Sequence, residues 1–128
     1  MTMRNACLIL CIVLGSSLVS HPVTAQQSAP DTNAITPAMV DLGRAIFHGK
    51  GTCFACHGAQ LEGTQIAPTL KAHAWRDAKN GQLDELFRVL THGVPSTVMV
   101  AFPGGISRTE ALNVAAYVWS VNKRSAKP

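Results

Sequence analysis

Residues 53–57 of the chain read Cys-Phe-Ala-Cys-His, and the interpretation of the whole sequence depends on this short stretch. Cys53 and Cys56 are separated by two residues, and His57 follows directly. A disulfide across two intervening residues would close a very small loop, so it would stabilise the fold little. Disulfides of this spacing occur mainly at sites of thiol redox chemistry. A chemical role therefore explains the stretch better than a structural cross-link does.

The spacing of Cys53, Cys56 and His57 is the attachment pattern of a c-type haem. Two thiols three residues apart on one helical turn can reach the two vinyl groups on one edge of a porphyrin, and the next residue then projects its imidazole toward the iron. We therefore predict one covalently bound haem c, with His57 as an iron ligand. A thiol–disulfide site without haem is the alternative. That reading requires a strand before the motif and a βαβ pattern around it, which the sequence lacks.

The first 25 residues have the three parts of a secretory signal peptide. Arg4 gives a basic start, residues 6–19 are almost wholly apolar, and residues 23–25 end in small side chains. The apolar run of about 14 residues is shorter than the roughly 20 needed to span a bilayer. We expect cleavage after residue 25 and export to the periplasm, with an uncleaved signal anchor as the alternative. Cleavage removes two of the four cysteines and leaves the two of the motif.

The composition fits one small folded domain. The chain has 128 residues, of which 47% are hydrophobic and 14% charged. Disordered proteins have fewer hydrophobic and more charged residues than this. Only 5% are aromatic, so a core of side chains alone would be thin, and a bound haem would supply the missing apolar bulk. The net charge of +4 is mild and unclustered, which argues against a nucleic-acid partner.

Helical signals flank the motif on both sides. Thr36 is a suitable N-cap and Pro37 a suitable first residue for a helix over residues 37–48, which Gly49 and Gly51 end. We divide the chain after the signal peptide into a flexible leader, a folded domain and a C-terminal tail, over residues 26–36, 37–122 and 123–128.

Two more helices are predicted after the motif. Residues 82–91 carry one apolar face and are followed by Gly93 as C-cap; the face consists of Leu83, Leu86, Phe87 and Leu90. Residues 107–110 read Ser-Arg-Thr-Glu, a capping box that begins a last helix through about Val121. Residues 58–80 show little periodicity and are read mainly as loop. The prediction is an all-α domain.

Together these features resemble a class I cytochrome c, over about residues 37–121. The resemblance rests on the motif after a first helix, a proline downstream, a late methionine and a last helix containing Ala-Ala-Tyr-Val-Trp-Ser-Val. It implies a small soluble monohaem protein with three to four helices around the haem, and with its first and last helices crossing. By position, the residues of that crossing are Gly43, Phe47, Val114 and Tyr117.

The resemblance also implies an iron bound by a histidine and a methionine. His57 is the histidine, and Met99 lies in the loop before the last helix, where this family carries its methionine. A neutral thioether favours ferrous iron more than a second imidazole does, so such a pair raises the reduction potential. Met39, the other methionine outside the signal peptide, lies on the first helix. His73 and His92 are the rival ligands.

Three further residues match positions near the haem in related cytochromes. Pro68 stands where the family's proline offers its carbonyl oxygen to the second nitrogen of the haem histidine, which would fix the orientation of that ring. Trp75 and Arg76 stand near the expected propionates, and their N–H groups suit carboxylates; surface positions without haem contact are the alternative. The apolar residues expected to line the pocket are Leu61, Ile66, Leu70, Leu86, Phe87, Leu90, Val98 and Phe102.

These observations predict an electron-transfer protein and no enzyme, since the sequence has no nucleophile–base or carboxylate-pair motif. It would carry single electrons between redox partner proteins, as a monomer or as the haem subunit of a dehydrogenase or oxidase complex, with no membrane span after signal cleavage. A haem enzyme or gas sensor with a labile sixth ligand is the alternative. Basic residues near the last helix would guide acidic partners or form a solvated face: Arg108, Lys123, Arg124 and Lys127.

Overall fold

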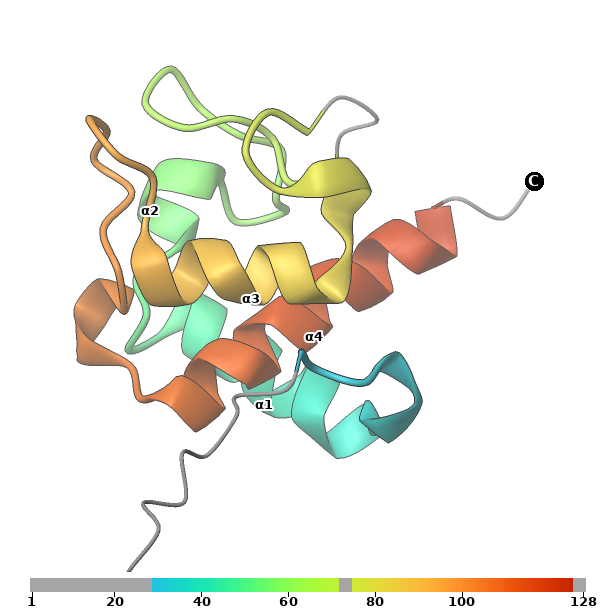
Figure 1. Ribbon diagram of the computed structural model, residues 1–128. Helices are drawn as coiled ribbons and strands as arrows, with labels where there is room; N and C mark the ends of the chain where they lie inside the picture. The colour runs from blue at the N-terminus through green and yellow to red at the C-terminus, as the bar shows by residue number, and fades with distance from the viewer. Residues whose placement is uncertain (1–28, 72–74, 126–128) are drawn as a thin grey trace, which may run out of the picture.

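The computed structural model describes residues 29–71 and 75–125 of the chain. Within these ranges it has α-helices and short 3₁₀ helices and no strand, so the all-α prediction is confirmed. The α-helices are α1 (Pro37–His48), α2 (Phe54–His57), α3 (Leu83–His92) and α4 (Arg108–Ser125) (Figure 1). The 3₁₀ helices are η1 (Thr32–Ala34), η2 (Lys79–Gly81) and η3 (Pro103–Gly105). The expected signal peptide, residues 1–25, lies outside the described residues.

Helices α1 and α4 cross closely and form the centre of the fold (Figure 1). A Cβ atom at Gly43 of α1 would overlap the backbone carbonyl oxygen of Asn113 in α4 and would lie 2.9 Å from the Cβ of Tyr117. Only glycine therefore permits this approach of the two backbones. Beside it, the rings of Phe47 and Tyr117 pack edge to face, with centroids 5.7 Å apart. The expected crossing is confirmed. Val114 is buried as well, but the partner of Gly43 is the backbone of Asn113.

The ends of α1 and α3 follow the local signals of the sequence. The side chain of Thr36 accepts a hydrogen bond from the Met39 N–H at 3.3 Å, and Pro37 is the first helical residue, so α1 begins as predicted. Helix α3 begins one residue later than predicted, at Leu83, and Gly93 ends it with φ near +70°. The four predicted apolar residues of α3 are all buried in the core that α4 shares.

Two predicted boundaries differ from the ends of the helices in the structure. The leader was expected to be flexible through residue 36, yet it contains η1, and Ile35 packs against the core. The last helix was expected to end near Val121, but α4 continues to Ser125. Near this end, the side-chain amide of Asn122 donates to the carbonyl oxygens of Leu70 and Val118, at 2.7 and 2.8 Å, and so joins α4 to the loop at Leu70. The expected tail therefore begins inside α4.

Helix α4 begins with the predicted capping box. The carboxylate of Glu110 accepts the Ser107 N–H at 2.6 Å, and the Ser107 hydroxyl accepts the Glu110 N–H at 3.2 Å. The ammonium group of Lys50 also donates to both carboxylate oxygens of Glu110, at 2.9 and 3.1 Å. The Ser107 N–H, and after it Lys50, hold the pKa of Glu110 at about 2, below its ordinary value of 4.5.

Glu110→Gln is expected to lower stability at neutral pH and to remove part of the acid sensitivity of the fold. Because the pKa of Glu110 is lower in the folded chain, its contribution is complete above about pH 4.5 and is lost as the pH falls toward 2. Melting temperatures of the two proteins should therefore differ by a few degrees at pH 7 and converge near pH 2. Asp41→Asn, in an exposed ion pair 3.8 Å from Arg44, is the control and should have little effect. A difference that stays constant with pH would contradict this origin.

Candidate functional site

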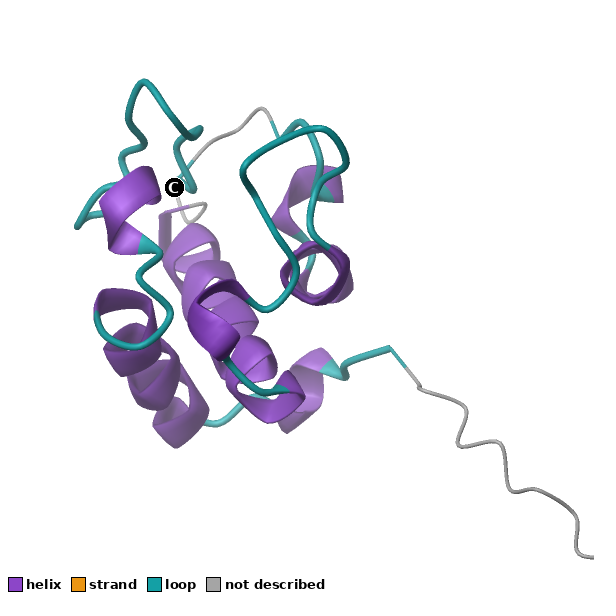
Figure 2. Cartoon of the chain, turned by 90° about the vertical axis from the view of Figure 1, so that its left-hand side faces the viewer, coloured by secondary structure: helices purple, strands orange, loops and turns teal. Residues whose placement is uncertain are grey.

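A cavity of about 810 Å³ opens in the domain, and all the predicted site residues line it. The short helix α2, the loop after it and the loop between α3 and α4 all contribute. Figure 2 shows that these loops lie mainly at one end of the molecule, above the crossing helices. The structure thus brings together five residues from three separate segments: Cys53, Cys56, His57, Pro68 and Met99.

The motif forms a single helical turn, as its chemistry requires. Cys53 is the N-cap of α2, and the His57 N–H donates to the Cys53 carbonyl at 2.9 Å. Gly58 follows with φ near +80° and ends the turn. Thr52, with φ near +51°, turns the chain between α1 and Cys53. Both thiols and the imidazole therefore belong to one rigid turn beside the cavity.

The imidazole of His57 is held by the loop that follows it. Its Nδ1 atom lies 2.9 Å from the carbonyl oxygen of Pro68. Because a carbonyl only accepts, Nδ1 carries the proton, and Nε2 is left with the lone pair that a metal ligand needs. The loop is fixed to the motif by two further bonds: the Gly63 N–H donates to the His57 carbonyl at 2.8 Å, and the Thr64 hydroxyl donates to the Cys56 carbonyl at 2.7 Å.

Met99 is presented by a tight loop after α3. The Val94 N–H donates to the Met99 carbonyl at 2.8 Å, and the Met99 N–H donates to the Thr97 hydroxyl at 3.1 Å. Gly93 makes the turn possible, since a Cβ atom there would lie 2.7 Å from the Met99 carbonyl oxygen. The half-buried side chain of Met99 packs against the core and lines the cavity.

The rival ligands are placed differently. Within the described residues the cavity lining includes neither Met39 nor His92. Met39 packs against the core from α1. His92 is exposed at the end of α3, with its Nδ1 atom 2.9 Å from the Thr91 hydroxyl and 3.1 Å from the Arg88 carbonyl oxygen. His73 lies outside the described residues.

The prediction of the apolar lining is partly wrong. Five of the eight expected residues line the cavity: Ile66, Leu70, Leu86, Leu90 and Val98. The other three do not. Leu61 is 2% exposed and belongs to the core, Phe87 packs under the guanidinium of Arg108 at 4.7 Å, and Phe102 adopts a left-handed backbone and packs against the core. Sequence reasoning missed residues of the crossing helices that line the cavity instead: Phe47, Val114, Ala115 and Val118.

Comparison with known proteins identifies the family. The family model described as cytochrome c oxidase, cbb3-type, subunit III matches residues 38–118, more than half of the chain. The chain belongs to this family. The cytochrome is 34% identical over 95 residues to the cbb3-type cytochrome c oxidase subunit CcoP of Azospirillum brasilense, a match that covers 65% of this chain and 31% of that relative. It thus spans about a third of the length of this curated relative.

Solved structures agree with the fold of the cytochrome. Cytochrome cL of Methylophaga aminisulfidivorans superimposes with a TM-score of 0.56 at 26% identity, covering 65% of this chain and 55% of the other. Cytochrome cL of Hyphomicrobium denitrificans gives a TM-score of 0.54 at 22% identity, covering 70% and 61%, and supports the fold alone. The predicted class I cytochrome c fold is confirmed, and the family implies a covalently bound haem c.

The residues around the cavity fit a haem. The thiols of Cys53 and Cys56 would suit covalent attachment of the ring, and the imidazole of His57 and the thioether of Met99 could serve as ligands of its iron. The fit also disfavours the thiol–disulfide alternative, because burial raises the pKa of the Cys53 thiol to about 11. Redox-active thiols instead have lowered pKa values.

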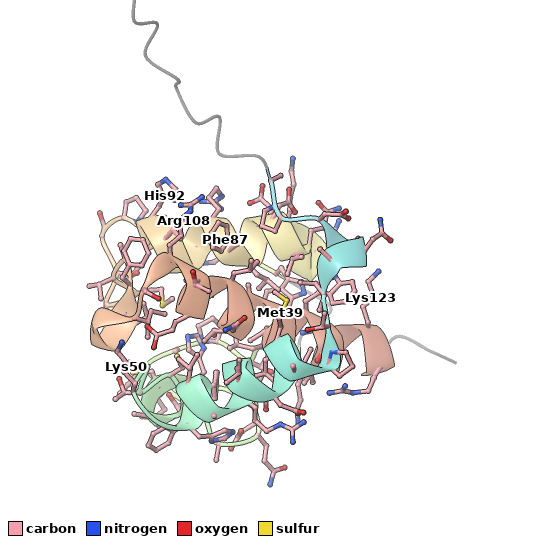
Figure 3. All side chains as sticks on the ribbon, turned by 90° about the horizontal axis from the view of Figure 1, so that it is seen from below. Met39, Lys50, Phe87, His92, Arg108 and Lys123 are labelled. Atoms are coloured by element: carbon pink, nitrogen blue, oxygen red, sulfur yellow. The ribbon has the colours of Figure 1, made fainter. Side chains whose placement is uncertain are left out.

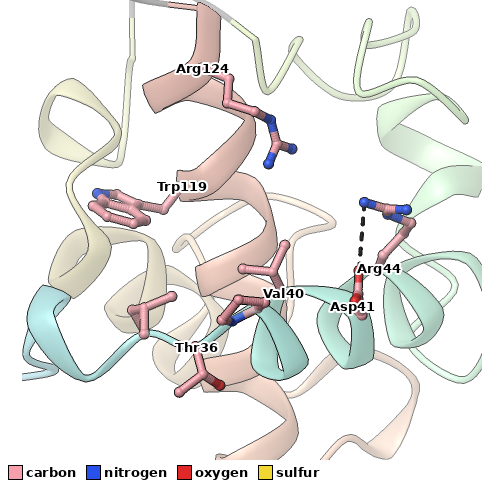
Figure 4. A pocket seen from close by; sticks show the side chains of 8 residues that line it. Thr36, Val40, Asp41, Arg44, Trp119 and Arg124 are labelled. Atoms are coloured by element: carbon pink, nitrogen blue, oxygen red, sulfur yellow. Dashed lines mark ion pairs between the residues drawn. The ribbon is translucent and has the colours of Figure 1, made fainter.

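A second, smaller cavity of about 340 Å³ lies between the start of α1 and the end of α4 (Figure 4). Trp119 and Arg124 of α4 line it together with Val40 and Arg44 of α1, and none of the predicted site residues belongs to it. In the part of the chain that the structure describes, every helix is too short or too polar to cross a membrane.

Proposed function

We propose that this cytochrome carries single electrons through one haem c, attached at Cys53 and Cys56 and ligated by His57 and Met99. The observation that carries the proposal is that these four side chains line one cavity, with Nδ1 of His57 already fixed by the Pro68 carbonyl at 2.9 Å. When bound, the haem supplies an iron that accepts and releases one electron.

The cysteines, the histidine and the methionine would each have a separate role in holding the haem. Cys53 and Cys56 would hold the ring covalently, each through a thioether made by adding its S–H across a vinyl group, with no group released. The Pro68 carbonyl keeps the imidazole of His57 oriented and makes it a better donor. Met99 offers a neutral sulfur, and the apolar lining excludes water, so both favour the ferrous state and a high potential.

Trp75 and Arg76 are the proposed partners of the haem propionates. Both line the cavity, and the Arg76 side chain is 76% exposed, at the cavity mouth. Its Nε atom donates to Asp77 at 3.2 Å, and the guanidinium has further N–H groups that could bind a carboxylate. Trp75 is held by Gly81, where a Cβ atom would lie 2.7 Å from the indole ring.

We further propose export to the periplasm through the signal peptide at residues 1–25. The partners would be redox proteins, either as a freely encountered donor and acceptor or as fellow subunits of an oxidase complex. The similarity to an oxidase subunit of Azospirillum brasilense supports the second arrangement. Arg108 and Lys123, which Figure 3 labels on α4, are exposed cations that suit an acidic docking surface.

Spectroscopy and redox titration of the purified holoprotein test the proposal. We expect a low-spin haem with a methionine-to-iron charge-transfer band in the oxidised form, and a reversible one-electron couple. A high-spin resting spectrum, or rapid binding of carbon monoxide to the reduced protein, would instead indicate the alternative of an enzyme or sensor with an open sixth position.

A further inference from the structure

Lys50 lies where three segments of the cytochrome meet. It stands between α1 and the motif, three residues before Cys53. Its ammonium group donates to both oxygens of Glu110, at 2.9 and 3.1 Å, although the two residues are 60 positions apart in sequence. Figure 3 shows Lys50 at the edge of the molecule, beside the start of α4. The two side chains are 52% and 29% exposed, so water screens the pair only in part.

The backbone of Lys50 also meets the loop that carries Met99. A Cβ atom at Gly104 would overlap the Lys50 carbonyl oxygen and would lie 3.2 Å from the Cα of Gly51. Gly104 has φ near +66°, so both its conformation and its surroundings require glycine. Gly104 lines the cavity five residues after Met99. The segment before the cysteines and the segment after the methionine are thus in direct contact.

The methionine loop is anchored at two places. Toward α3, the Phe102 N–H donates to the Leu90 carbonyl at 2.8 Å. Toward α4, the chain passes through Gly104 into the capping box, where the carboxylate of Glu110 binds Ser107 and Lys50 together. In this second anchor, the Lys50 side chain supplies the bonds that join Glu110 to the segment before the cysteines.

We propose that Lys50 is a positioning residue, whose bridge to Glu110 holds the loop of Met99 against the segment that carries Cys53. The inference rests on the proposed function, in which Met99 is the sixth ligand. Without the bridge the loop separates more often from the cysteine segment, so the sulfur leaves the iron more often. The helical core stays folded, because the crossing of α1 and α4 at Gly43 does not involve Lys50.

Lys50→Met in the holoprotein tests the inference, because it keeps the length of the side chain and removes its charge. Imidazole competes with a methionine for the iron, so its apparent affinity should rise about two- to fivefold, as expected from the strength of a partly exposed ion pair. The amide hydrogens of Phe102 and Gly105 should also exchange faster with solvent. The helical signal should melt at nearly the temperature of the unchanged protein.

Two matched variants separate the bridge from other effects. Ser107→Ala removes the hydroxyl that caps α4 but keeps the bond between Lys50 and Glu110, so imidazole affinity should not change. Lys79→Met removes a positive charge from an exposed position of η2 and should also leave it unchanged. In a double variant, Lys50→Met with Glu110→Gln, the two effects on imidazole affinity should overlap instead of adding, because both remove one interaction.

Unchanged imidazole affinity in Lys50→Met would overturn the inference, as would an equal rise in Lys79→Met. A loss of helical stability that accounts for the whole rise would overturn it as well, because the role would then be merely structural. The proposed function fails separately: if Met99→Ala keeps the charge-transfer band, Met99 is not the ligand. If Met99→Ala loses the band and Lys50→Met behaves as the unchanged protein, only the role of Lys50 is wrong.

Discussion

Replacement of both Cys53 and Cys56 by alanine should leave a chain that does not fold cooperatively. The two thiols are half-buried, so their own loss removes little packing. The large effect comes from the haem, which the variant cannot hold. Without the ring, the apolar side chains around a cavity of about 810 Å³ would lose their packing partner and stay in contact with water. A whole domain is stable by only roughly 5–15 kcal/mol, so the loss of this burial leaves little stability.

Circular dichroism and thermal unfolding measure this effect. The variant should show reduced helical signal and no sharp transition, whereas the single variant Cys53→Ala keeps one point of attachment and should retain a transition at a lower temperature. Added free haem should restore part of the helical signal to the double variant, which separates the loss of the ring from the loss of the thiols. A compact double variant that unfolds cooperatively without haem would show that side chains alone make a sufficient core.

Met99→Ala should remove the methionine-to-iron charge-transfer band of the oxidised protein. Alanine has no donor atom, so the iron either becomes high-spin or takes a ligand from solvent. The midpoint potential should fall by on the order of 0.1 V or more, because axial ligands set haem potentials over a range of about 0.8 V. Optical spectra and a redox titration of the same sample give both values.

Met39→Ala is the matched control for this experiment. Met39 is also partly buried against the core, but it lies on α1 and does not line the cavity. Its replacement should lower stability and leave the band and the potential in place. If the band survives in Met99→Ala and disappears in His92→Ala, or if Met39→Ala abolishes it, the ligand has been assigned to the wrong residue.

Local patterns in the sequence predicted the helix ends that frame the domain. The N-cap at Thr36, the capping box at Ser107 and Glu110 and the C-cap at Gly93 all depend on residues within one turn, and all are present. The contact of His57 with Pro68, eleven positions apart, was instead expected from the resemblance to class I cytochromes c. The helix caps could be predicted because each depends only on residues that are close together in sequence.

Features that depend on contacts between residues far apart in sequence were not predicted. The bond that joins the end of α4 to the loop at Leu70 links residues 52 positions apart. Leu61 and Phe102 were expected in the cavity lining, but both have positive φ, a conformation that periodicity does not reveal. Phe47 was read as a contact of the helix crossing, and it serves both the crossing and the cavity. The periodicity of a helix places a side chain on one face, but it does not show that the side chain contacts both a second helix and a cavity.

The small cavity between α1 and α4 bears on how the domain can be joined to another domain. Ile35 precedes α1 and Arg124 lies near the end of α4, yet both line this one cavity, which shares no residue with the large one. A further domain joined to the chain before α1 or after α4 would therefore be attached on the same side of this domain. The mouth of the large cavity would then stay clear of that further domain and open to a docking partner.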